Sequence, residues 1–326
     1  MFCRNAMKII QIKHLTKRYR DLVAVNSLSL TINAGDVHGI LGPNGAGKST
    51  LISCITGLHA ADSGEILYEG GSSIRKWSQN IGYVPQELAI YPELSAYENI
   101  KFFASLYGMK GGELEKKVRQ SLDFVGLTEV KDKKSSEFSG GMKRRLNLAC
   151  AITHSPKLII MDEPTVGIDP QSRNRILENV HQLNKQGVTV IYTTHYMAEA
   201  EAICNTITVV DKGSVIASGT KEEIMGMMGQ GTVYLVTVDT AGGTWNRFLE
   251  SVEALEQVSQ VQIQEQEDKE FSINQCSCLI RCSESGVIDA IITAATQSGL
   301  IVKNIAHSEP DLEEIFLTLT GKELRD

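Results

Sequence analysis

A glycine-rich segment at positions 42–50, "GPNGAGKST", constrains the fold of this chain more than any other feature. It lies between a short apolar run, "VHGIL", and a stretch with helical character, "TLISCITGL". The glycines at positions 42, 45 and 47 remove the side chains that would hold the backbone away from a ligand at a tight turn. The segment therefore predicts a strand, a loop and a helix, with the first N–H groups of the helix converging on an anion.

The spacing within the segment indicates that the anion is the phosphate of a nucleotide. It fits the phosphate-loop pattern G-x-x-x-x-G-K-[ST], in which Lys48 would neutralise the β- and γ-phosphates and the Ser49 hydroxyl would bind Mg²⁺. A plain glycine turn is the weaker interpretation, because a chance match occurs in roughly one chain of this length in a hundred. The candidate ATP-binding residues of the loop are Gly42, Pro43, Asn44, Gly45, Ala46, Gly47, Lys48, Ser49 and Thr50.

Two adjacent carboxylates, Asp162 and Glu163, follow the apolar run of "LIIMDEPT". Because parallel strands end at the sheet edge from which a phosphate loop leaves, we expect both carboxylates beside the nucleotide. Asp162 would hold Mg²⁺ through its water shell, and Glu163 would orient and polarise the attacking water. Alone, an acidic pair after a strand is more often a solvated turn, but the phosphate loop upstream favours the catalytic interpretation.

Hydrophobic periodicity predicts an α/β fold for the first two thirds of the chain. Residues 8–32 contain two segments with period-two alternation, which indicates an antiparallel pair of strands. The nearly continuous apolar runs "VHGIL", "LIIM" and "VTVIYT" are typical of strands buried on both faces of a parallel sheet. A hairpin is expected at 209–219, followed by a short helix and by a linker at 225–231, "MGMMGQG".

The remaining residues predict a second domain. After the linker, the order strand, helix, strand, strand, helix, strand is that of a ferredoxin-like α+β domain. A last helix is expected to begin at the capping-box pair Ser308 and Asp311 and to carry an apolar stripe. We place the first domain at 8–228 and the second at 229–326. The apolar stripe consists of Leu312, Ile315, Phe316 and Leu319.

Composition argues against several classes of function. The net charge of -7 and the pI near 5.6 disfavour a protein that binds nucleic acid through a general basic surface. The 7 cysteines, an odd number, suit a reducing cytosol better than a disulfide framework. Cys276, Cys278 and Cys282 share one face of a predicted strand, so buried thiols are favoured over a zinc site. No stretch has the roughly 18 apolar residues of a membrane span, so another polypeptide would supply any span.

A second glycine-opened helix start, "FSGGMKRRL" at 138–146, needs an explanation. The unpaired N–H groups of such a helix, together with its dipole, could bind an anion. The segment lacks a lysine at the position that Lys48 holds in the first loop, and one nucleotide needs only one phosphate loop.

With these motifs in this order, the chain resembles the nucleotide-binding subunits of ABC (ATP-binding cassette) transporters over residues 8 to about 220. The resemblance implies a P-loop ABC ATPase core with an antiparallel β subdomain and a helical subdomain. It implies that Tyr19 stacks on adenine and that Gln86 joins the metal site. It also implies that Asp169 lies in the loop that crosses between subunits, and that His195 is the switch histidine facing the γ-phosphate.

The same resemblance implies a role for the second glycine-opened helix. Ser139, Gly140 and Gly141 would contact the γ-phosphate of ATP held by the opposite subunit, so that ATP joins two copies head to tail. Met142 stands where many family members have Gln, and methionine cannot donate the hydrogen bond of that side chain. The three basic residues at 143–145 are interpreted as a solvated helix face rather than as a nucleic-acid surface.

The function expected from these residues is that of the ATP-binding and ATP-hydrolysing subunit of a membrane transporter. Lys48, Glu163 and His195 would be its catalytic residues, with ATP and Mg²⁺ as ligands. The segments "SGGMKRRL" and "LEEIFL" resemble those of a bacterial branch of multidrug and export ATPases, which implies an exporter. A separate transmembrane permease would dock on the segment after Gln86 and hold the protein at the cytoplasmic face of the cell membrane. No nucleic acid is expected as a partner.

The alternative is a soluble ABC-type ATPase that acts on ribosomes or DNA. Such proteins usually carry tandem cassettes or a long coiled-coil insertion. Here only 51 residues, 87–137, separate Gln86 from "FSGG". That length suits a small helical subdomain, which we place at about 87–155. Phosphate-loop kinases and GTPases would need neither the "SGG" segment nor His195.

Overall fold

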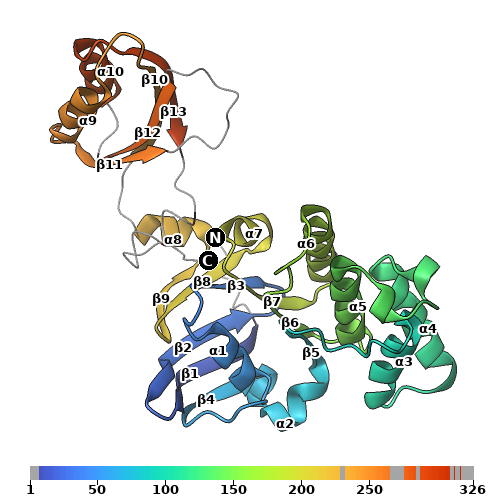
Figure 1. The fold of residues 1–326 in the computed structure, drawn as a ribbon. Coiled ribbons are helices and arrows are strands. Elements are labelled where there is room, and N and C mark those ends of the chain that lie inside the picture. The colour runs from blue at the N-terminus through green and yellow to red at the C-terminus, as the bar shows by residue number, and fades with distance from the viewer. Residues whose placement is uncertain are drawn as a thin grey trace. The chain divides into compact units, whose positions relative to one another are not determined.

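An antiparallel sheet forms from the N-terminal part of the chain (Figure 1). In it, β1 (Lys8–Tyr19) pairs with β2 (Leu22–Asn33) on one side and with β4 (Ser63–Tyr68) on the other. The antiparallel pair expected from the alternation at 8–32 is confirmed. The strand β4 is not predicted by its sequence, "SGEILY", because only its last positions are apolar.

The computed structural model divides after Lys221 into two compact units. Within the described part of the chain, no helix is both long and apolar enough to cross a membrane. The described residues are 7–227, 232–264, 275–283 and 287–308, together with Leu312 and Phe316.

A six-stranded sheet in the order β5-β6-β7-β3-β8-β9 forms the centre of the first unit. All pairs in it are parallel except the last, β8 with β9. The residues of β3, β6 and β7 are all buried, which is why their sequences are continuous apolar runs. The parallel sheet and the hairpin expected at 209–219 are both confirmed. The strands are β3 (Val37–Leu41), β5 (Ile81–Val84), β6 (Leu158–Asp162), β7 (Thr189–Thr194), β8 (Thr206–Asp211) and β9 (Ser214–Gly219).

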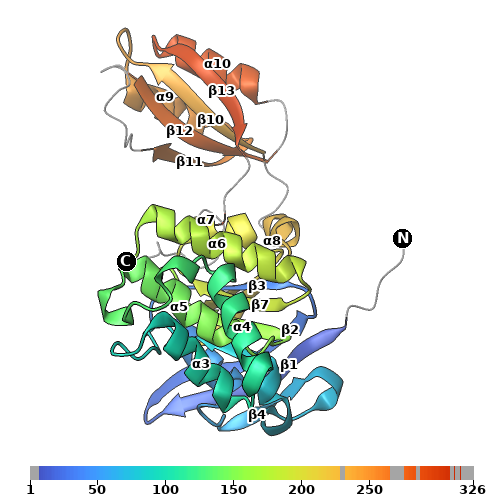
Figure 2. The ribbon, with the colours of Figure 1, turned by 90° about the vertical axis from the view of Figure 1, so that its right-hand side faces the viewer.

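Helices follow the strands of this unit and cover the sheet, and Figure 2 shows α4, α5 and α6 in front of it. Between β5 and β6 the chain forms only helices and loops, in the range where the sequence predicts a helical subdomain. The helices are α1 (Lys48–Ile55), α2 (Ile74–Trp77), α3 (Ala96–Leu106), α4 (Gly111–Phe124), α5 (Gly140–Ile152), α6 (Pro170–Lys185), α7 (Met197–Ile203) and α8 (Lys221–Met227). Short 3-10 helices span Glu69–Gly71, Ser78–Asn80, Thr128–Val130 and Ser135–Glu137.

Two hydrophobic clusters pack on the two faces of the six-stranded sheet. Successive residues of a strand point to opposite faces, and β6 and β7 divide accordingly. Met161 and Tyr192 belong to the cluster on the helical side, whereas Ile160 and Ile191 belong to the cluster shared with α1 and the antiparallel sheet. This two-sided burial fixes the carboxyl ends of β6 and β7, and the segments that follow them, against each other.

The second unit contains a four-stranded antiparallel sheet in the order β11-β12-β10-β13. Two helices pack with the sheet in one core around Phe248 and Ile291. The prediction that the cysteine-rich strand buries one face is confirmed, because Cys278 and Cys282 are fully buried in this core and Cys276 is half-buried. The elements are β10 (Thr232–Asp239), α9 (Trp245–Glu253), β11 (Val258–Gln264), β12 (Gln275–Cys282), α10 (Ile288–Gln297) and β13 (Ile301–Ser308).

Two expectations concern the ends of this unit. The prediction of a linker at 225–231 is wrong for residues 225–227, because α8 continues to Met227. Residues 228–231 lie outside the described part of the chain. Most of the expected last helix, including Asp311, also lies outside the described residues. Its two described members, Leu312 and Phe316, are helical and buried.

Candidate active site

The glycine-rich loop leaves β3 and turns into α1. Gly47 has φ of 103°, a conformation that favours glycine. A Cβ at Gly47 would lie 2.2 Å from the carbonyl oxygen of Ala24, and one at Gly42 would lie 2.2 Å from that of Val210. The two glycines are therefore required by the packing of the loop against β2 and β8, in addition to any ligand.

Lys48 is the first residue of α1 and is only 5% exposed. Its Nζ donates to the carbonyl oxygen of Gly42 over 2.8 Å and to that of Pro43 over 3.3 Å. The same atom lies 3.2 Å from Oε1 of Glu163. The ammonium group of Lys48 is thus held beside the loop by two carbonyl groups of the loop and by the buried carboxylate of Glu163.

Thr193, the partner of Asp162 in the β6–β7 register, contacts the Asp162 carboxylate and the backbone of Glu163. Its hydroxyl donates to Oδ1 of Asp162 over 2.6 Å and accepts from the backbone N–H of Glu163 over 2.9 Å. Glu163 has φ of 45°, a strained value for a side chain of this size. Burial raises the pKa of Tyr83 to about 12, and the nearby charge of Asp162 acts in the same direction.

His195 follows β7 and completes a cluster with Glu163 and Lys48. Its Nδ1 lies 3.4 Å from Oε2 of Glu163, whose other oxygen faces Lys48. Glu163 is 6% exposed, so these three groups interact in a site with little water. The structure therefore brings together the three residues that the sequence predicts to be catalytic.

The second glycine-opened helix, α5, is capped by its own serine. Ser139 is the N-cap, and its Oγ accepts from the backbone N–H of Met142 over 3.3 Å. Gly141 is buried, and a Cβ there would lie 2.0 Å from Oγ of Ser172 in α6. Asp169 caps α6 by accepting from the backbone N–H of Ser172 over 2.9 Å. Hydrogen bonds from the side chain and backbone of Ser172 lower the pKa of Asp169.

Comparisons with known proteins identify the family of this chain. Residues 25–166 match the family model described as ABC transporter. The chain is 44% identical over 321 residues to the linearmycin resistance ATP-binding protein LnrL of Bacillus subtilis (strain 168), covering 98% of this chain and 100% of that protein. The chain belongs to the ABC transporter family. The prediction of an ATP-binding and ATP-hydrolysing subunit of this family is thereby confirmed.

Further relatives extend the likeness of this ABC ATPase. It is 34% identical over 324 residues to the Nod factor export ATP-binding protein I of Cupriavidus pinatubonensis, covering 98% and 92% of the two chains. The structure of cbiO1 from Clostridium perfringens, described as part of the ABC transporter complex cbiONQ, matches at TM-score 0.62 and 31% identity, covering 68% of this chain and 92% of that one. The dimeric post-hydrolysis cassette MJ0796 bound to ADP and Pi matches at TM-score 0.59 and 27% identity, covering 65% and 98%.

Two predicted residues of the ABC site lie at the surface of the first unit. Tyr19 is the last residue of β1 and is 39% exposed, and its hydroxyl lies 2.7 Å from Nδ1 of His59. Gln86 follows β5 and is exposed. Within residues 7–227, the hydrogen bonds and ion pairs described here do not join either side chain to the cluster of Lys48, Glu163 and His195.

The prediction of a solvated basic face on α5 is wrong for two of its three residues. Arg144 donates to the carbonyl oxygens of Gln86 and Val166, the latter over 3.3 Å. Arg145 donates to the carbonyl oxygen of Val125 over 2.7 Å. Burial lowers the pKa of both guanidinium groups. The planar, many-donor guanidinium suits loop carbonyls that lack a backbone partner, so these residues join α5 to neighbouring loops.

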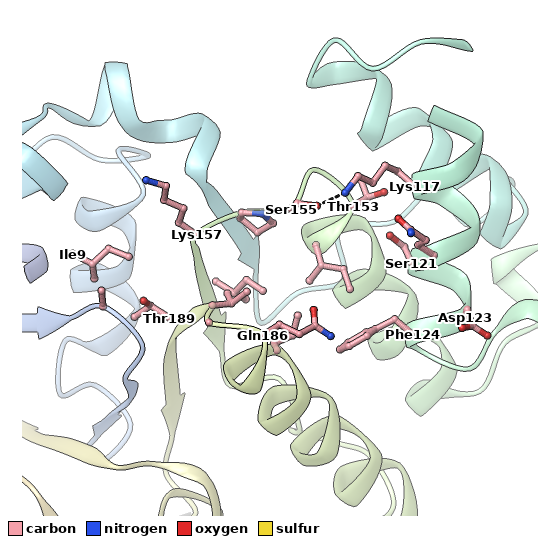
Figure 3. Close-up of a pocket in the computed structure, with 18 of the residues that line it drawn as sticks. Ile9, Lys117, Ser121, Asp123, Phe124, Thr153, Ser155, Lys157, Gln186 and Thr189 are labelled. Carbon is pink, nitrogen blue, oxygen red and sulfur yellow. Dashed lines mark hydrogen bonds between the residues drawn. The ribbon is translucent and has the colours of Figure 1, made fainter. Parts of the chain in front are cut away.

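A hollow of the first unit, shown in Figure 3, is lined by none of the predicted site residues. Its volume is about 770 Å³, and Lys117, Phe124 and Gln186 line it together with Lys157 and Thr189. The last two residues stand at the amino ends of β6 and β7, whereas the predicted catalytic residues follow the carboxyl ends of the same strands. The hollow is therefore at the wrong edge of the sheet for the phosphate chemistry.

Sequence reasoning missed the polar residues that support the cluster. Thr193 and Glu199 are buried and hydrogen-bonded beside it. A signal exists in the sequence, because "VIYTTHYMAEAE" places hydroxyl groups in an otherwise apolar strand and a glutamate soon afterwards. Buried hydroxyls need partners, and that need could have indicated a polar network.

Proposed function

We propose that this ABC ATPase powers export through a separate permease by hydrolysing ATP at the cluster of Lys48, Glu163 and His195. The observation that carries the proposal is the placement of Glu163, whose two oxygens lie 3.2 Å from Lys48 Nζ and 3.4 Å from His195 Nδ1. An ammonium group, a carboxylate and an imidazole at one buried point are the groups that phosphate binding and water activation need.

Each residue of the cluster has a distinct task in this mechanism. The N–H groups of the loop at 42–50 bind the phosphates, and Lys48 turns from its carbonyl partners toward the β- and γ-phosphates. Glu163, released from Lys48, orients the attacking water and accepts its hydrogen bond. His195, which lies beside the Glu163 oxygen that does not face Lys48, contacts the terminal phosphate. Low exposure of the cluster strengthens each of these charge interactions.

The residues proposed as Mg²⁺ ligands fit that ion by their chemistry. Ser49, Asp162 and Gln86 supply hydroxyl, carboxylate and amide oxygens, which are the hard ligands that Mg²⁺ prefers. The hydrogen bond from Thr193 to Asp162 is the kind of support that orients a ligating carboxylate. When bound, Mg²⁺ would neutralise charge on the phosphate oxygens.

A second copy of the chain would complete the site. Ser139 and Gly140 are exposed at the start of α5, and the Ser139 hydroxyl retains its proton for donation while accepting from Met142. We propose that they face the γ-phosphate of ATP held by the other copy, with Gly141 behind them and Asp169 crossing the interface. Tyr19 would stack on the adenine of its own nucleotide. The two copies would be arranged head to tail.

An aromatic cluster in the predicted helical subdomain supports docking of the permease. The rings of Tyr91 and Phe102 lie 5.1 Å apart, and those of Phe102 and Phe103 lie 5.5 Å apart. Tyr91 is 49% and Phe102 38% exposed, whereas Phe103 packs on the core. Exposed aromatic side chains that pack against a buried core can form a contact surface for an apolar partner helix. Docking there would hold the protein at the cytoplasmic face of the membrane.

The names of the relatives support the direction of transport and the class of function. One is named for linearmycin resistance and another for Nod factor export. Both cover almost the whole chain, including the second unit. An exporter subunit is therefore favoured over a soluble ATPase that acts on ribosomes or DNA.

For the second unit we propose a ferredoxin-like fold. Its element order is strand, helix, strand, strand, helix, strand, and its sheet order is β11-β12-β10-β13. We retain domains at 8–228 and 229–326, close to the division after Lys221.

Replacement of the proposed general base tests the proposed function. In the full chain, Glu163→Gln should bind ATP with wild-type affinity and lose turnover by roughly 10²- to 10⁴-fold, because the amide cannot take up the proton of water. Sedimentation with ATP should show a trapped dimer. Glu65→Gln, at the exposed edge of the antiparallel sheet, is the matched control and should hydrolyse ATP as wild type. Undiminished turnover by Glu163→Gln would remove Glu163 from this role.

Purification from native membranes tests the partner. A protein with several membrane spans should accompany the chain, and the complex should hydrolyse ATP. Recovery with ribosomes in its place would favour the soluble alternative.

A further inference from the structure

A buried carboxylate near the active site has no place in the mechanism so far. Glu199 lies in α7, four residues after His195, and is only 3% exposed. Burying a carboxylate at such depth is costly unless donors surround it. The hydrogen-bond donors come from the turn after β6 and from β7, and an ion-pair partner comes from α6.

Three hydroxyl groups and one guanidinium group face this carboxylate. Thr165 Oγ1 lies 2.8 and 2.9 Å from the two oxygens of Glu199. The hydroxyls of Tyr192 and Thr194 donate to Oε2 over 2.9 and 3.0 Å. Arg173 Nε lies 3.3 Å from Oε1 in an ion pair. Burial and the charge of Glu199 raise the pKa of Tyr192 well above its ordinary value, so its hydroxyl remains a donor.

Two of these donors lie in, or directly before, the turns that carry the proposed catalytic residues. Thr165 is the second residue after Glu163, and Thr194 immediately precedes His195. One carboxylate therefore holds both turns by direct hydrogen bonds. Movement of either turn relative to Glu199 would change the 3.4 Å separation between Glu163 Oε2 and His195 Nδ1.

Arg173 connects the same carboxylate to α6. Its backbone N–H donates to the carbonyl oxygen of Asp169 over 2.9 Å in the first turn of the helix. Its guanidinium carbon lies 4.9 Å from the centre of the Tyr196 ring. Tyr196 in turn donates its backbone N–H to Oγ1 of Thr194 over 2.9 Å. The helix that begins at Asp169 thus shares one network with the turn at His195.

We propose that Glu199 is a positioning residue for ATP hydrolysis, which fixes the Glu163 turn against the His195 turn and links both to the start of α6. This inference rests on the proposed function, because it requires Glu163 and His195 to act on ATP. The simpler interpretation is a satisfied buried carboxylate that only stabilises the fold. The two differ in kinetics: a role in stability alone changes the amount of folded protein, whereas positioning changes the turnover of each folded molecule.

The direct test is Glu199→Gln in the full chain. The amide keeps the shape but replaces one acceptor oxygen with an NH₂ group, which cannot accept from the surrounding hydroxyls. We expect kcat per folded molecule to fall on the order of 10²-fold, with KM for ATP and nucleotide affinity unchanged. Glu201→Gln is the matched control, because Glu201 lies in the same helix, paired with Lys221 at 3.5 Å, and should leave kcat unchanged. A folded Glu199→Gln protein with wild-type kcat would overturn the proposal.

A second pair of variants tests the same network without altering the buried charge. Thr165→Val retains nearly the same volume and lacks the hydroxyl, whereas Thr165→Ser retains the hydroxyl. We expect Thr165→Val to lower kcat at unchanged KM and Thr165→Ser to restore most of the loss. Equal kcat values for the two variants would contradict positioning through Glu199, even where Glu199→Gln fails to fold.

Failure of the positioning role can be distinguished from failure of the proposed function. If the wild-type chain hydrolyses ATP and Glu163→Gln does not, the proposed function stands. Wild-type kcat in Glu199→Gln and Thr165→Val would then overturn the positioning role alone. A wild-type chain that binds no ATP would overturn both.

Discussion

The helices α1 and α5 both begin next to glycine, yet their first turns are used differently. At α1, the N-cap Gly47 has no side chain that could cap the helix, and the buried Lys48 follows it. At α5, the N-cap Ser139 already accepts from the backbone N–H of Met142. A side chain of the protein thus caps the first turn of α5, whereas no side chain caps the first turn of α1.

Under the proposed function, this difference separates a complete phosphate site from a partial one. The start of α1 combines backbone donors with a cation, so it can hold a phosphate by itself. The start of α5 offers the proton of the Ser139 hydroxyl and the helix dipole. Its first helical residue is glycine, however, and the oxygen of Ser139 already accepts from the N–H of Met142. Under the proposed function, α1 seats the nucleotide and α5 recognises one already seated.

Loss of the cation should have the largest effect on this contrast. In Lys48→Ala, ATP affinity and turnover should each fall roughly 10²- to 10³-fold, because the loop loses its charge and Glu163 loses its partner at 3.2 Å. Equilibrium binding of a fluorescent ATP analogue measures the first quantity. Lys13→Ala, which breaks only the exposed pair with Glu65, is the control and should bind as wild type. Tight ATP binding by Lys48→Ala would refute the assignment of α1 as the phosphate site.

Adding a side chain at Gly141, where α5 packs against α6, should have the next largest effect. In Gly141→Ala, the new Cβ would stand 2.0 Å from Oγ of Ser172, which would force α5 away from α6. We expect the free energy of unfolding to fall by about 1–3 kcal/mol, measured as a lower Tm. Binding of ATP by a single copy should persist because α1 is not involved.

The adjacent glycine provides the control for this packing effect. A Cβ at Gly140 would first meet an atom at 3.8 Å, an ordinary contact, so Gly140→Ala should unfold at or above the wild-type temperature. Equal Tm values for Gly140→Ala and Gly141→Ala would show that the contact with Ser172 is unimportant.

The parts of the fold that local pattern decides could be predicted from the sequence. The nearly continuous apolar runs of β3, β6 and β7 are typical of buried strands, and the spacing of residues 42–50 indicates a phosphate loop. The same patterns place Asp162 and Glu163 at the end of a strand. Burial of Cys278 follows likewise from the period of its strand.

The remaining features depend on contacts between distant segments, which local pattern does not contain. Arg144 resembles a solvated residue on a helical wheel, and only the fold brings the carbonyl of Gln86 to it. Glu199 resembles a surface residue of an amphipathic helix, and only the β6–β7 register surrounds it with hydroxyls. Glycine is likewise required at position 141 because a Cβ there would collide with Ser172 of α6.

The smallest effect should come from the serine cap, and it separates the two tasks of Ser139. Ser139→Ala removes the acceptor for the N–H of Met142, which should cost about 1 kcal/mol of stability. Ser139→Asp retains a good cap, so its Tm should match that of wild type. The aspartate would, however, place a negative charge where the terminal phosphate of the other copy's ATP is proposed to lie.

Comparing the two variants therefore tests the partial site directly. Both should bind ATP as single copies with wild-type affinity. Ser139→Ala should retain part of the ATP-driven dimer in sedimentation, because the helix dipole and backbone remain. Ser139→Asp should lose the dimer and ATP turnover despite its intact stability, because two negative charges would meet without water between them. Wild-type turnover by Ser139→Asp would mean that the serine only caps its own helix, and that α5 is no phosphate-recognising counterpart of α1.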